Sequence, residues 1–243
     1  MFKKLKSQVQ GFAYLFSHPA QLKRVIIREA RYGKRHQSKR SWMDWQKYDQ
    51  YTAHLLHSSA EARARPLNVE RIKTISDMVS HSGNGLKILD VGCGEGSISQ
   101  QIANMGNYVT SVDLPTITDL AHRHRALSVV AGDAEQLAFV SNCFDLVLAS
   151  EVIEHLWNPH NFFDEAHRVL TDNGHLIIEV PEGKESLRWD AHKNYFTVKG
   201  LKQMLAAKFT ACEVQLLQPT GFPTPTMIMR LRKSKKTKKS IIE

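Results

Sequence analysis

The sequence is poor in cysteine and has no long apolar run. Of its 243 residues only three are cysteine, and Cys93, Cys143 and Cys212 show neither a paired spacing nor a C-x-x-C motif. A disulfide framework and a zinc site built from cysteines are therefore not expected, and a reducing cytoplasm is the simple interpretation. No segment approaches the ~20 apolar residues of a membrane span, and Phe12–Phe16 is too short for the core of a signal peptide.

Basic residues are scarce in the middle of the chain, although its net charge is +9. Residues 1–47 carry 12 Lys/Arg against 2 Asp/Glu, and residues 230–243 carry 7 against 1. The intervening residues 48–229 carry 14 basic against 21 acidic side chains. Because phosphate contacts need Lys and Arg, an extended nucleic-acid-binding face on this acidic middle part is disfavoured.

A glycine-rich turn between a predicted strand and a predicted helix is the most informative segment. Leu86–Val91 reads as a short buried strand, and the apolar positions of Ser97–Met105 are typical of a helix. The glycines at 92, 94 and 96 let ligand atoms approach the backbone, and Asp90 places a carboxylate beside them. Taken alone, the segment is equally compatible with an ordinary tight strand-to-helix connection.

The spacing of these glycines is G-x-G-x-G and lacks the last glycine of the dinucleotide fingerprint. Ser97 stands where G-x-G-x-x-G would require it. A nicotinamide-dependent oxidoreductase is therefore the least favoured enzyme class.

Polar residues also stand at the ends of three further predicted strands. Asp113 closes the strand that begins at Tyr108 and lies 23 residues after Asp90, where a ribose-binding acid is expected. Asp133 follows the third strand and is placed to take an adenine amino group, and Ser150 ends the fourth strand. Singly, each would be read as a solvated loop residue. Together they indicate a ligand site, because open α/β sheets bind ligands at the carboxyl ends of their strands.

Strands and helices alternate from residue 70 onward, which predicts an α/β fold with a doubly wound, mostly parallel, seven-stranded sheet. The later elements are expected as a helix over Asn161–Leu170 capped by Asn158 with Pro159 in its first position, a turn over 171–174, a strand over His175–Val180, a helix over Val198–Phe209, and strands over Ala211–Leu217 and Met227–Leu231. Residues 181–194 are polar and without a period, and a connection of that length is usually functional.

Three parts of the chain follow from these patterns. Residues 66–231 form the predicted catalytic domain, residues 1–65 a basic helical N-terminal extension, and residues 232–243 a basic disordered tail. In the extension, five apolar residues recur at helical spacing beside three lysines, so residues 1–16 could lie on an anionic membrane surface. The alternatives are a helix that packs on the domain and a solvated tail.

Three segments carry a resemblance to a known family. They are Leu89–Gly94, Glu151–His155, and the stretch at residues 66–72 upstream. In these segments the chain resembles class I S-adenosylmethionine-dependent methyltransferases, and the ubiquinone-biosynthesis O-methyltransferases look nearest. The resemblance implies S-adenosyl-L-methionine as the cofactor. It departs from the family in one place, where the Asn-Pro-Leu-Arg order is scrambled.

By this likeness Arg71 holds the cofactor's carboxylate, with Arg65 as the fallback, Gly92 contacts its methionine portion, and Ser150 contacts it through the backbone. Asp113 would bind the ribose. The predicted cofactor-binding residues are Arg71, Asp90, Gly92, Gly94, Gly96, Asp113, Leu114, Asp133, Ala134 and Ser150.

A hydroxyl acceptor of a methyl group must lose a proton, and histidine is the natural base near neutral pH. His155 follows the fourth strand on the rim where the methyl group should lie, and His192 lies in the irregular segment after the fifth strand. Residues 192–197 resemble the H-x-x-[FY]-[FY]-[ST] stretch of glycan-modifying members of the superfamily. We predict His155 and His192 as catalytic residues, the alternatives being a brace for the cofactor loop and a structural hydrogen bond.

A metal site is the competing interpretation of this region. Glu151, Glu154 and His155 have the spacing i, i+3 and i+4, so one helical turn would place all three on one face. Without a fourth ligand this is a weak metal signature, and we predict no bound metal.

The patterns together predict a cytoplasmic methyltransferase, with a place at the inner face of the membrane as an extension. Its expected reaction is O-methylation of a glycan, lipid-linked or quinone-like small molecule. The Asn/Asp-Pro-Pro-Tyr/Phe motif of amino-methylating enzymes is absent after the fourth strand, where residues 150–153 stand instead. Two alternatives are an RNA (tRNA) methyltransferase that uses the basic termini as substrate arms, and a non-catalytic partner that keeps the cofactor fold. The sequence does not indicate an oligomeric state.

Overall fold

The computed structural model describes residues 66–114, 128–188, 192–218 and 224–234. The chain divides into two compact units, Met1–Ser59 and Ala60–Glu243, and all the described residues belong to the second. The predicted N-terminal extension over 1–65 and residues 235–243 of the predicted tail lie outside the described residues. Within the described ranges, no helix combines the length and the apolar character needed to cross a membrane.

A seven-stranded sheet with the order β3-β2-β1-β4-β5-β7-β6 forms the centre of the domain. Five adjacent strands, from β3 to β5 in this order, pair in parallel, and β7 pairs antiparallel with both β5 and β6. The strands are β1 (Lys87–Val91), β2 (Tyr108–Asp113), β3 (Ser128–Ala131), β4 (Phe144–Ser150), β5 (Leu170–Pro181), β6 (Phe209–Leu217) and β7 (Thr226–Lys233). The predicted seven-stranded, mostly parallel sheet is confirmed.

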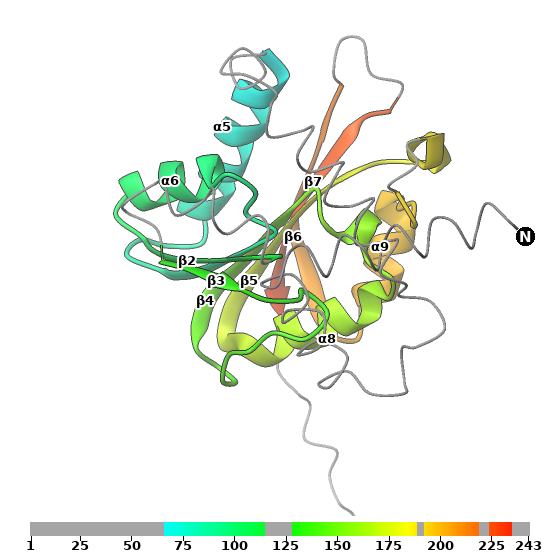
Figure 1. Ribbon diagram of the computed structural model, residues 1–243. Helices are drawn as coiled ribbons and strands as arrows, with labels where there is room; N and C mark the ends of the chain where they lie inside the picture. The colour runs from blue at the N-terminus through cyan, green and yellow to red at the C-terminus, as the bar shows by residue number, and fades with distance from the viewer. Residues whose placement is uncertain (1–65, 115–127, 189–191, 219–223, 235–243) are drawn as a thin grey trace, which may run out of the picture. The chain divides into compact units, whose positions relative to one another are not determined.

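Helices cover both faces of this sheet, as a doubly wound fold requires (Figure 1). On one side lie α5 (Pro66–Ser80) and α6 (Ser97–Asn104), and on the other α8 (Pro159–Val169) and α9 (Val198–Leu205). Two short 3-10 helices, η2 (Ile153–His155) and η3 (Lys184–Arg188), follow β4 and β5. The strand order reverses between β1 and β4, and open α/β sheets bind ligands at the carboxyl ends of the strands beside such a reversal.

The central strands are apolar on both faces because each face is covered by helices. In β4, Leu146 and Leu148 belong to the core under α5 and α6, while Val147 and Ala149 belong to the core under α8 and α9. All four side chains are fully buried. Successive side chains of a strand point to opposite faces, so one uninterrupted apolar run supplies two cores.

Two predicted element boundaries are wrong at the region around residues 170–174 and at Phe209. The predicted turn over 171–174 is part of β5, and the β4–β5 register shifts between Phe144, opposite Leu170, and Leu146, opposite His175. The four residues thus form an irregularity inside the strand, which the turn-forming composition does not distinguish from a hairpin. The helix over 198–209 ends at Leu205, because Phe209 enters the core as the first residue of β6.

The start of α8 agrees with the sequence. The side chain of Asn158 accepts a hydrogen bond from the backbone N–H of His160, and Pro159 is the first helical residue. The helix ends one residue before the predicted end, since Leu170 is already extended.

Candidate active site

The glycine turn after β1 keeps an open backbone at the carboxyl edge of the sheet. Its three glycines all have left-handed φ angles, 72° at Gly92, 56° at Gly94 and 84° at Gly96. A methyl group added at Gly94 would meet nothing within 4 Å, so the backbone there is accessible to a ligand. The turn ends where α6 begins at Ser97, with Gly96 as an N-cap that has no side chain to satisfy the helix amides.

Asp113, at the end of β2, faces this turn. Its Oδ2 accepts a hydrogen bond of 2.8 Å from the N–H of Gly94, and its Oδ1 accepts one of 2.6 Å from the N–H of Leu114. Burial raises the pKa of Asp113 to about 6, and the two backbone hydrogen bonds act in the opposite direction. A carboxylate held in this way is oriented before any ligand arrives.

Asp90, by contrast, lies inside the domain. Only 2% of its surface is exposed, and it accepts a hydrogen bond from the hydroxyl of Ser99 in α6. Ser99 in turn lies 2.9 Å from the hydroxyl of Ser111 in β2. Burial raises the pKa of Asp90 to about 6. Its carboxylate therefore connects β1, β2 and α6 beneath the turn. Asp90 would then act on the cofactor indirectly, by holding these three elements in place.

Asp133 and Ala134 lie in the loop after β3, at the same edge of the sheet, and their role in cofactor binding stays a prediction. The Oδ1 of Asp133 accepts a hydrogen bond of 2.8 Å from the N–H of Glu135. The sequence reasoning overlooked Glu135, which is buried and accepts hydrogen bonds from the N–H groups of Trp157, at 2.9 Å, and Asn158, at 3.3 Å. Glu135 thereby fixes the segment between β4 and α8. No pattern in the sequence distinguishes it from a solvated loop acid.

A buried glutamate at the end of β5 organises another side of the site. Glu179 has a side chain with 0% exposure and accepts hydrogen bonds from both Arg71 in α5 and the hydroxyl of Ser150 at the end of β4. The Arg71 contact is two-pronged, with Nη2 at 2.9 Å from Oε2. Burial opposes the charge of Arg71, but the carboxylates of Glu179 and Glu151 outweigh it and raise the pKa of Arg71. An acid inside the apolar run of residues 176–180 was the available signal for Glu179.

Arg71, predicted to hold the carboxylate of the cofactor, is paired with carboxylates of the protein. Its guanidinium is engaged by Glu179 and lies 3.9 Å from Oε1 of Glu151. Glu151 itself adopts a left-handed φ of 55°, a conformation that non-glycine residues keep mainly where the surrounding structure imposes it. Its N–H donates to the carbonyl of Glu179 at 3.0 Å.

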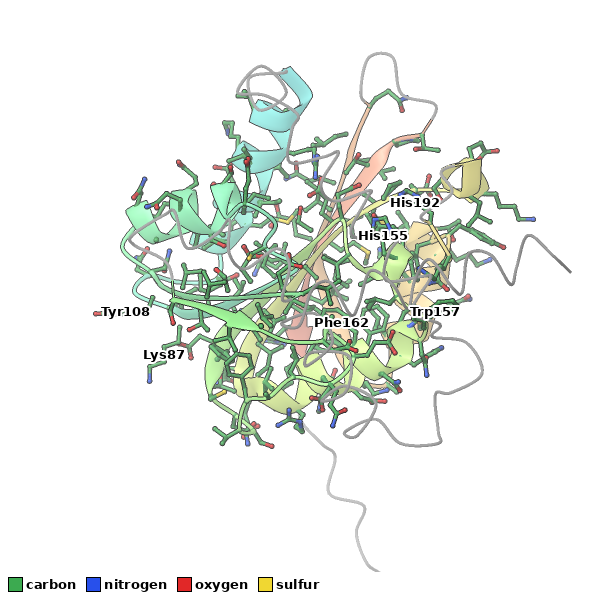
Figure 2. The ribbon with its side chains drawn as sticks, in the orientation of Figure 1. Lys87, Tyr108, His155, Trp157, Phe162 and His192 are labelled. Atoms are coloured by element: carbon green, nitrogen blue, oxygen red, sulfur yellow. The ribbon has the colours of Figure 1, made fainter. Side chains whose placement is uncertain are left out.

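His155 and His192, predicted independently as bases, lie against each other (Figure 2). Their ring centroids are 4.9 Å apart in an edge-to-face arrangement. Burial lowers the pKa of His192, which leaves its ring neutral at pH 7 and able to accept a proton. The two residues are 37 positions apart in sequence, and only the folded chain brings them together.

Glu154, between the β4 end and His155, is the third titratable group of this cluster. Its carboxylate is fully buried, finds no hydrogen-bond donor among the described residues, and lies 3.8 Å from Nε2 of His155. Burial and the neighbouring Glu151 carboxylate raise the pKa of Glu154 above its ordinary value. In its ionised form, a carboxylate next to an imidazole can stabilise the ring when the ring takes up a proton.

The metal alternative takes a different form in the structure. Among the described residues, the ligand atoms of Glu154, His155 and His192 converge within 4.8 Å of one another, and Glu151 is not part of this set. The expectation that a helical turn would bring Glu151, Glu154 and His155 together is therefore corrected: Glu151 is left-handed, and η2 begins only at Ile153. The absence of a bound metal stays a prediction.

Comparison with known proteins bears on the fold of the domain. The family described as "Methyltransferase domain" matches residues 89–178. The structure of the N-methyltransferase NodS from Bradyrhizobium japonicum WM9, in complex with S-adenosyl-L-homocysteine, superposes with a TM-score of 0.63 at 21% identity, covering 71% of this chain and 90% of that one. The domain has the class I methyltransferase fold. The fold expected from the glycine turn and the strand ends is thus confirmed.

Among curated proteins, two ubiquinone biosynthesis O-methyltransferases are similar over the same region. The protein from Azorhizobium caulinodans is 34% identical over 130 residues, which are 47% of this chain and 51% of that protein. The mitochondrial protein from Mus musculus is 30% identical over 147 residues, 55% of this chain and 39% of that protein. The chain thus spans about half the length or less of these methyltransferase relatives.

Proposed function

We propose that this chain transfers a methyl group from S-adenosylmethionine to a hydroxyl oxygen of a small-molecule acceptor that is quinone-like, glycan-derived or lipid-linked. One juxtaposition carries the proposal. The open glycine turn and the oriented carboxylate of Asp113 follow parallel strands at one edge of the sheet. The contacting imidazoles of His155 and His192 follow parallel strands at the same edge. The similarity to ubiquinone biosynthesis O-methyltransferases supports the choice of oxygen as the acceptor atom.

The cofactor half of the site fits a nucleoside with an amino-acid arm. Because Gly94 has no side chain, the space beside its backbone is open to the cofactor. Asp113 offers a carboxylate for the ribose hydroxyls. Asp133, at the next strand end, is the candidate for contact with the adenine amino group. Arg71, which is paired with Glu179, is the candidate for binding the carboxylate of the cofactor. S-adenosylmethionine, when bound, supplies an electrophilic methyl group on a sulfonium.

The residues of the acceptor half then have two tasks. They must hold the hydroxyl oxygen in line with the methyl group, since proximity provides most of the rate, and they must take up the hydroxyl proton. His192 is neutral at pH 7 and suited to accept that proton, and His155 lies against it with Glu154 at its Nε2. In the cell we expect the protein in the cytoplasm, with contact to the inner face of the membrane through residues 1–16.

The first test is isothermal titration of the purified protein with S-adenosylhomocysteine, alongside an Asp113→Ala variant. Micromolar binding that weakens at least about tenfold in the variant, a loss of about 1.4 kcal/mol, supports the cofactor site. Asp164→Ala, on the exposed surface of α8, is the matched control and should bind like the wild type. A folded wild-type protein that binds neither S-adenosylhomocysteine nor S-adenosylmethionine would overturn the proposal.

The second test addresses the bases. With radiolabelled S-adenosylmethionine and a panel of catechols, sugars and lipid-linked sugars, His155→Gln and His192→Gln are compared with the wild type. A general base contributes about 10²–10⁴-fold, so a fall of that size in kcat is expected, with unchanged S-adenosylhomocysteine affinity. Unchanged kcat in both variants on an accepted substrate would exclude the two histidines as bases.

A further inference from the structure

The two segments that carry the histidines are joined by backbone hydrogen bonds into one surface. The N–H groups of Lys193 and Asn194 both donate to the carbonyl of Glu154, at 2.7 and 3.1 Å. The side-chain amide of Asn194 donates to the carbonyl of Leu156 at 2.7 Å. The chain over 192–194 therefore lies in a fixed position on the segment that runs from η2 to α8.

This arrangement places a lysine over an exposed tryptophan. The Nζ of Lys193 lies 4.7 Å from the centroid of the Trp157 ring and 3.2 Å from the carbonyl oxygen of His155. The side chain of Trp157 is 38% exposed. The backbone N–H of Trp157 donates to buried Glu135, which fixes the point from which the ring extends. A cation–π contact and a carbonyl acceptor together orient the ammonium group.

Exposure alternates along the segment that follows. His192 and Asn194 are half-buried, whereas Lys193 and Tyr195 are exposed, with Tyr195 at 43%. The Nζ of Lys184 lies 5.7 Å from the centroid of the Tyr195 ring, which makes a second pair of lysine and aromatic ring on the outer side. The inner side of the same segment carries the proposed base. The outer side therefore offers aromatic rings and lysine ammonium groups close in sequence to His192, the proposed base.

We infer that Trp157 and Lys193 form an acceptor subsite that takes a ring bearing one anionic group, with the ring face on Trp157 and the anion on Lys193. An exposed indole face binds flat or apolar ring surfaces, and an oriented ammonium group makes a charge-assisted hydrogen bond to a carboxylate or a phosphate. The acidic character of residues 48–229 argues for a single anionic group and against a polyanionic chain. The inference rests on the proposed function, because it assigns the acceptor side of the same site.

The ring could be aromatic or a sugar, and paired probes distinguish the two. The wild-type protein, saturated with S-adenosylhomocysteine, is titrated by ligand-observed NMR with 3,4-dihydroxybenzoate and its neutral amide, 3,4-dihydroxybenzamide. A second arm uses D-glucuronate and D-glucuronamide. The variants are Lys193→Gln, Trp157→Leu and, as a matched control, Lys199→Gln at an exposed position of α9.

In at least one arm we expect the acid to bind about tenfold more tightly than its amide, a difference of about 1.4 kcal/mol. Lys193→Gln should abolish this preference, Trp157→Leu should weaken the acid and the amide alike by about fivefold, and Lys199→Gln should change neither. The arm that shows the preference identifies the ring as aromatic or as a sugar.

The inference is overturned if the protein binds S-adenosylhomocysteine but no probe, if acid and amide bind equally in both arms, or if Lys193→Gln keeps the preference. Failure to bind S-adenosylhomocysteine, measured first in the same sample, is a failure of the proposed function. The two failures are therefore distinguishable.

Discussion

Single side chains at the edge of the sheet decide whether the cofactor turn keeps its shape. Gly92 is the tightest position, because its φ of 72° is left-handed and an added Cβ would collide with Cγ2 of Val152. Val152 is a stiff β-branched residue in the segment that leads to η2. The turn after β1 and the segment after β4 are therefore in direct contact.

We expect Gly92→Ala to lower the free energy of unfolding by about 3 kcal/mol and to abolish S-adenosylhomocysteine binding. Left-handed backbone costs a residue with a Cβ about 1–2 kcal/mol, and overpacking adds about 1–3 kcal/mol. Gly106→Ala is the control, since its φ is 86° but an added Cβ meets nothing within 4 Å. Equal losses in the two variants, measured by urea unfolding, would show that the Val152 contact is unimportant.

Asp90 illustrates the cost of a carboxylate beneath the turn. Burial raises its pKa to about 6, above the ordinary value of 3.8, so the folded state holds the proton more tightly than the unfolded state. The stabilisation from this proton is full below pH 3.8 and is lost as the pH rises through 6. At neutral pH the ionised group therefore opposes folding.

Asp90→Asn should accordingly stabilise the domain at pH 7.5 by roughly 1–3 kcal/mol, because each pKa unit corresponds to about 1.4 kcal/mol. The advantage over the wild type should shrink as the pH is lowered toward 4. Urea unfolding between pH 4 and 7.5 measures this. Asp77→Asn, at an exposed carboxylate of α5, should differ from the wild type by less than about 0.5 kcal/mol throughout. A variant that is less stable at pH 7.5 would contradict the assignment.

Among the elements, the start of α8 determines where the segment with His155 and Trp157 lies. The side chain of Asn158 caps the helix at its own N-terminus. Glu135, in the loop after β3, accepts hydrogen bonds from the N–H groups of Trp157 and Asn158. The N-cap residue and one residue of a distant loop thus accept the backbone N–H groups around the start of α8, where a helix by itself leaves amide groups unpaired. The proposed base and the acceptor subsite both depend on this junction.

Glu135→Ala should lower the free energy of unfolding by about 2–3 kcal/mol, since it removes a buried charged acceptor and leaves its N–H donors unsatisfied. Asn158→Ala should cost about 1 kcal/mol as the loss of an N-cap. Asp164→Ala, at an exposed position of the same helix, breaks only the surface ion pair with Lys208 and should cost less than about 1 kcal/mol. If thermal unfolding shows Glu135→Ala to be as mild as Asp164→Ala, the loop does not hold the helix.

For the molecule as a whole, the separation of charge between the basic ends and the acidic middle is the main feature that the domain fold does not explain. Residues 1–16 combine lysines with apolar residues at helical spacing, which motivates the proposed membrane contact. The attraction of each lysine to an anionic surface is worth about 1 kcal/mol and is weakened by salt.

Joint replacement of Lys3, Lys4 and Lys6 by Gln should weaken co-sedimentation with phosphatidylserine vesicles at least about tenfold, and binding to phosphatidylcholine vesicles should be weak for every protein. Joint replacement of Lys87, Lys199 and Lys202, all exposed on the domain, is the control and should have little effect. Equal loss in the two triple variants would assign the attraction to net charge rather than to residues 1–16.

Local sequence patterns were sufficient for the sheet, for the glycine turn and for the polar strand ends, because strand-to-helix alternation and apolar runs are short-range properties. The helix over 198–209 failed at Phe209 because burial in the core, a long-range property, overrides helical periodicity. Glu135 and Lys193 escaped attention for the same reason: their partners, Trp157 and Asn158 for one and Trp157 for the other, lie more than 20 residues away.

The placement of the candidate site residues divides along the same line. That Asp113 and Asp133 would share an edge follows from parallel strands alone, since their carboxyl ends coincide. Three other features required the packed chain. They are the contact of His155 with His192, the pairing of Arg71 with Glu179, and the place of Asp90 beneath the turn. Contacts of this kind depend on how loops close in three dimensions, and a side chain's neighbours across such distances leave no periodic trace in one sequence.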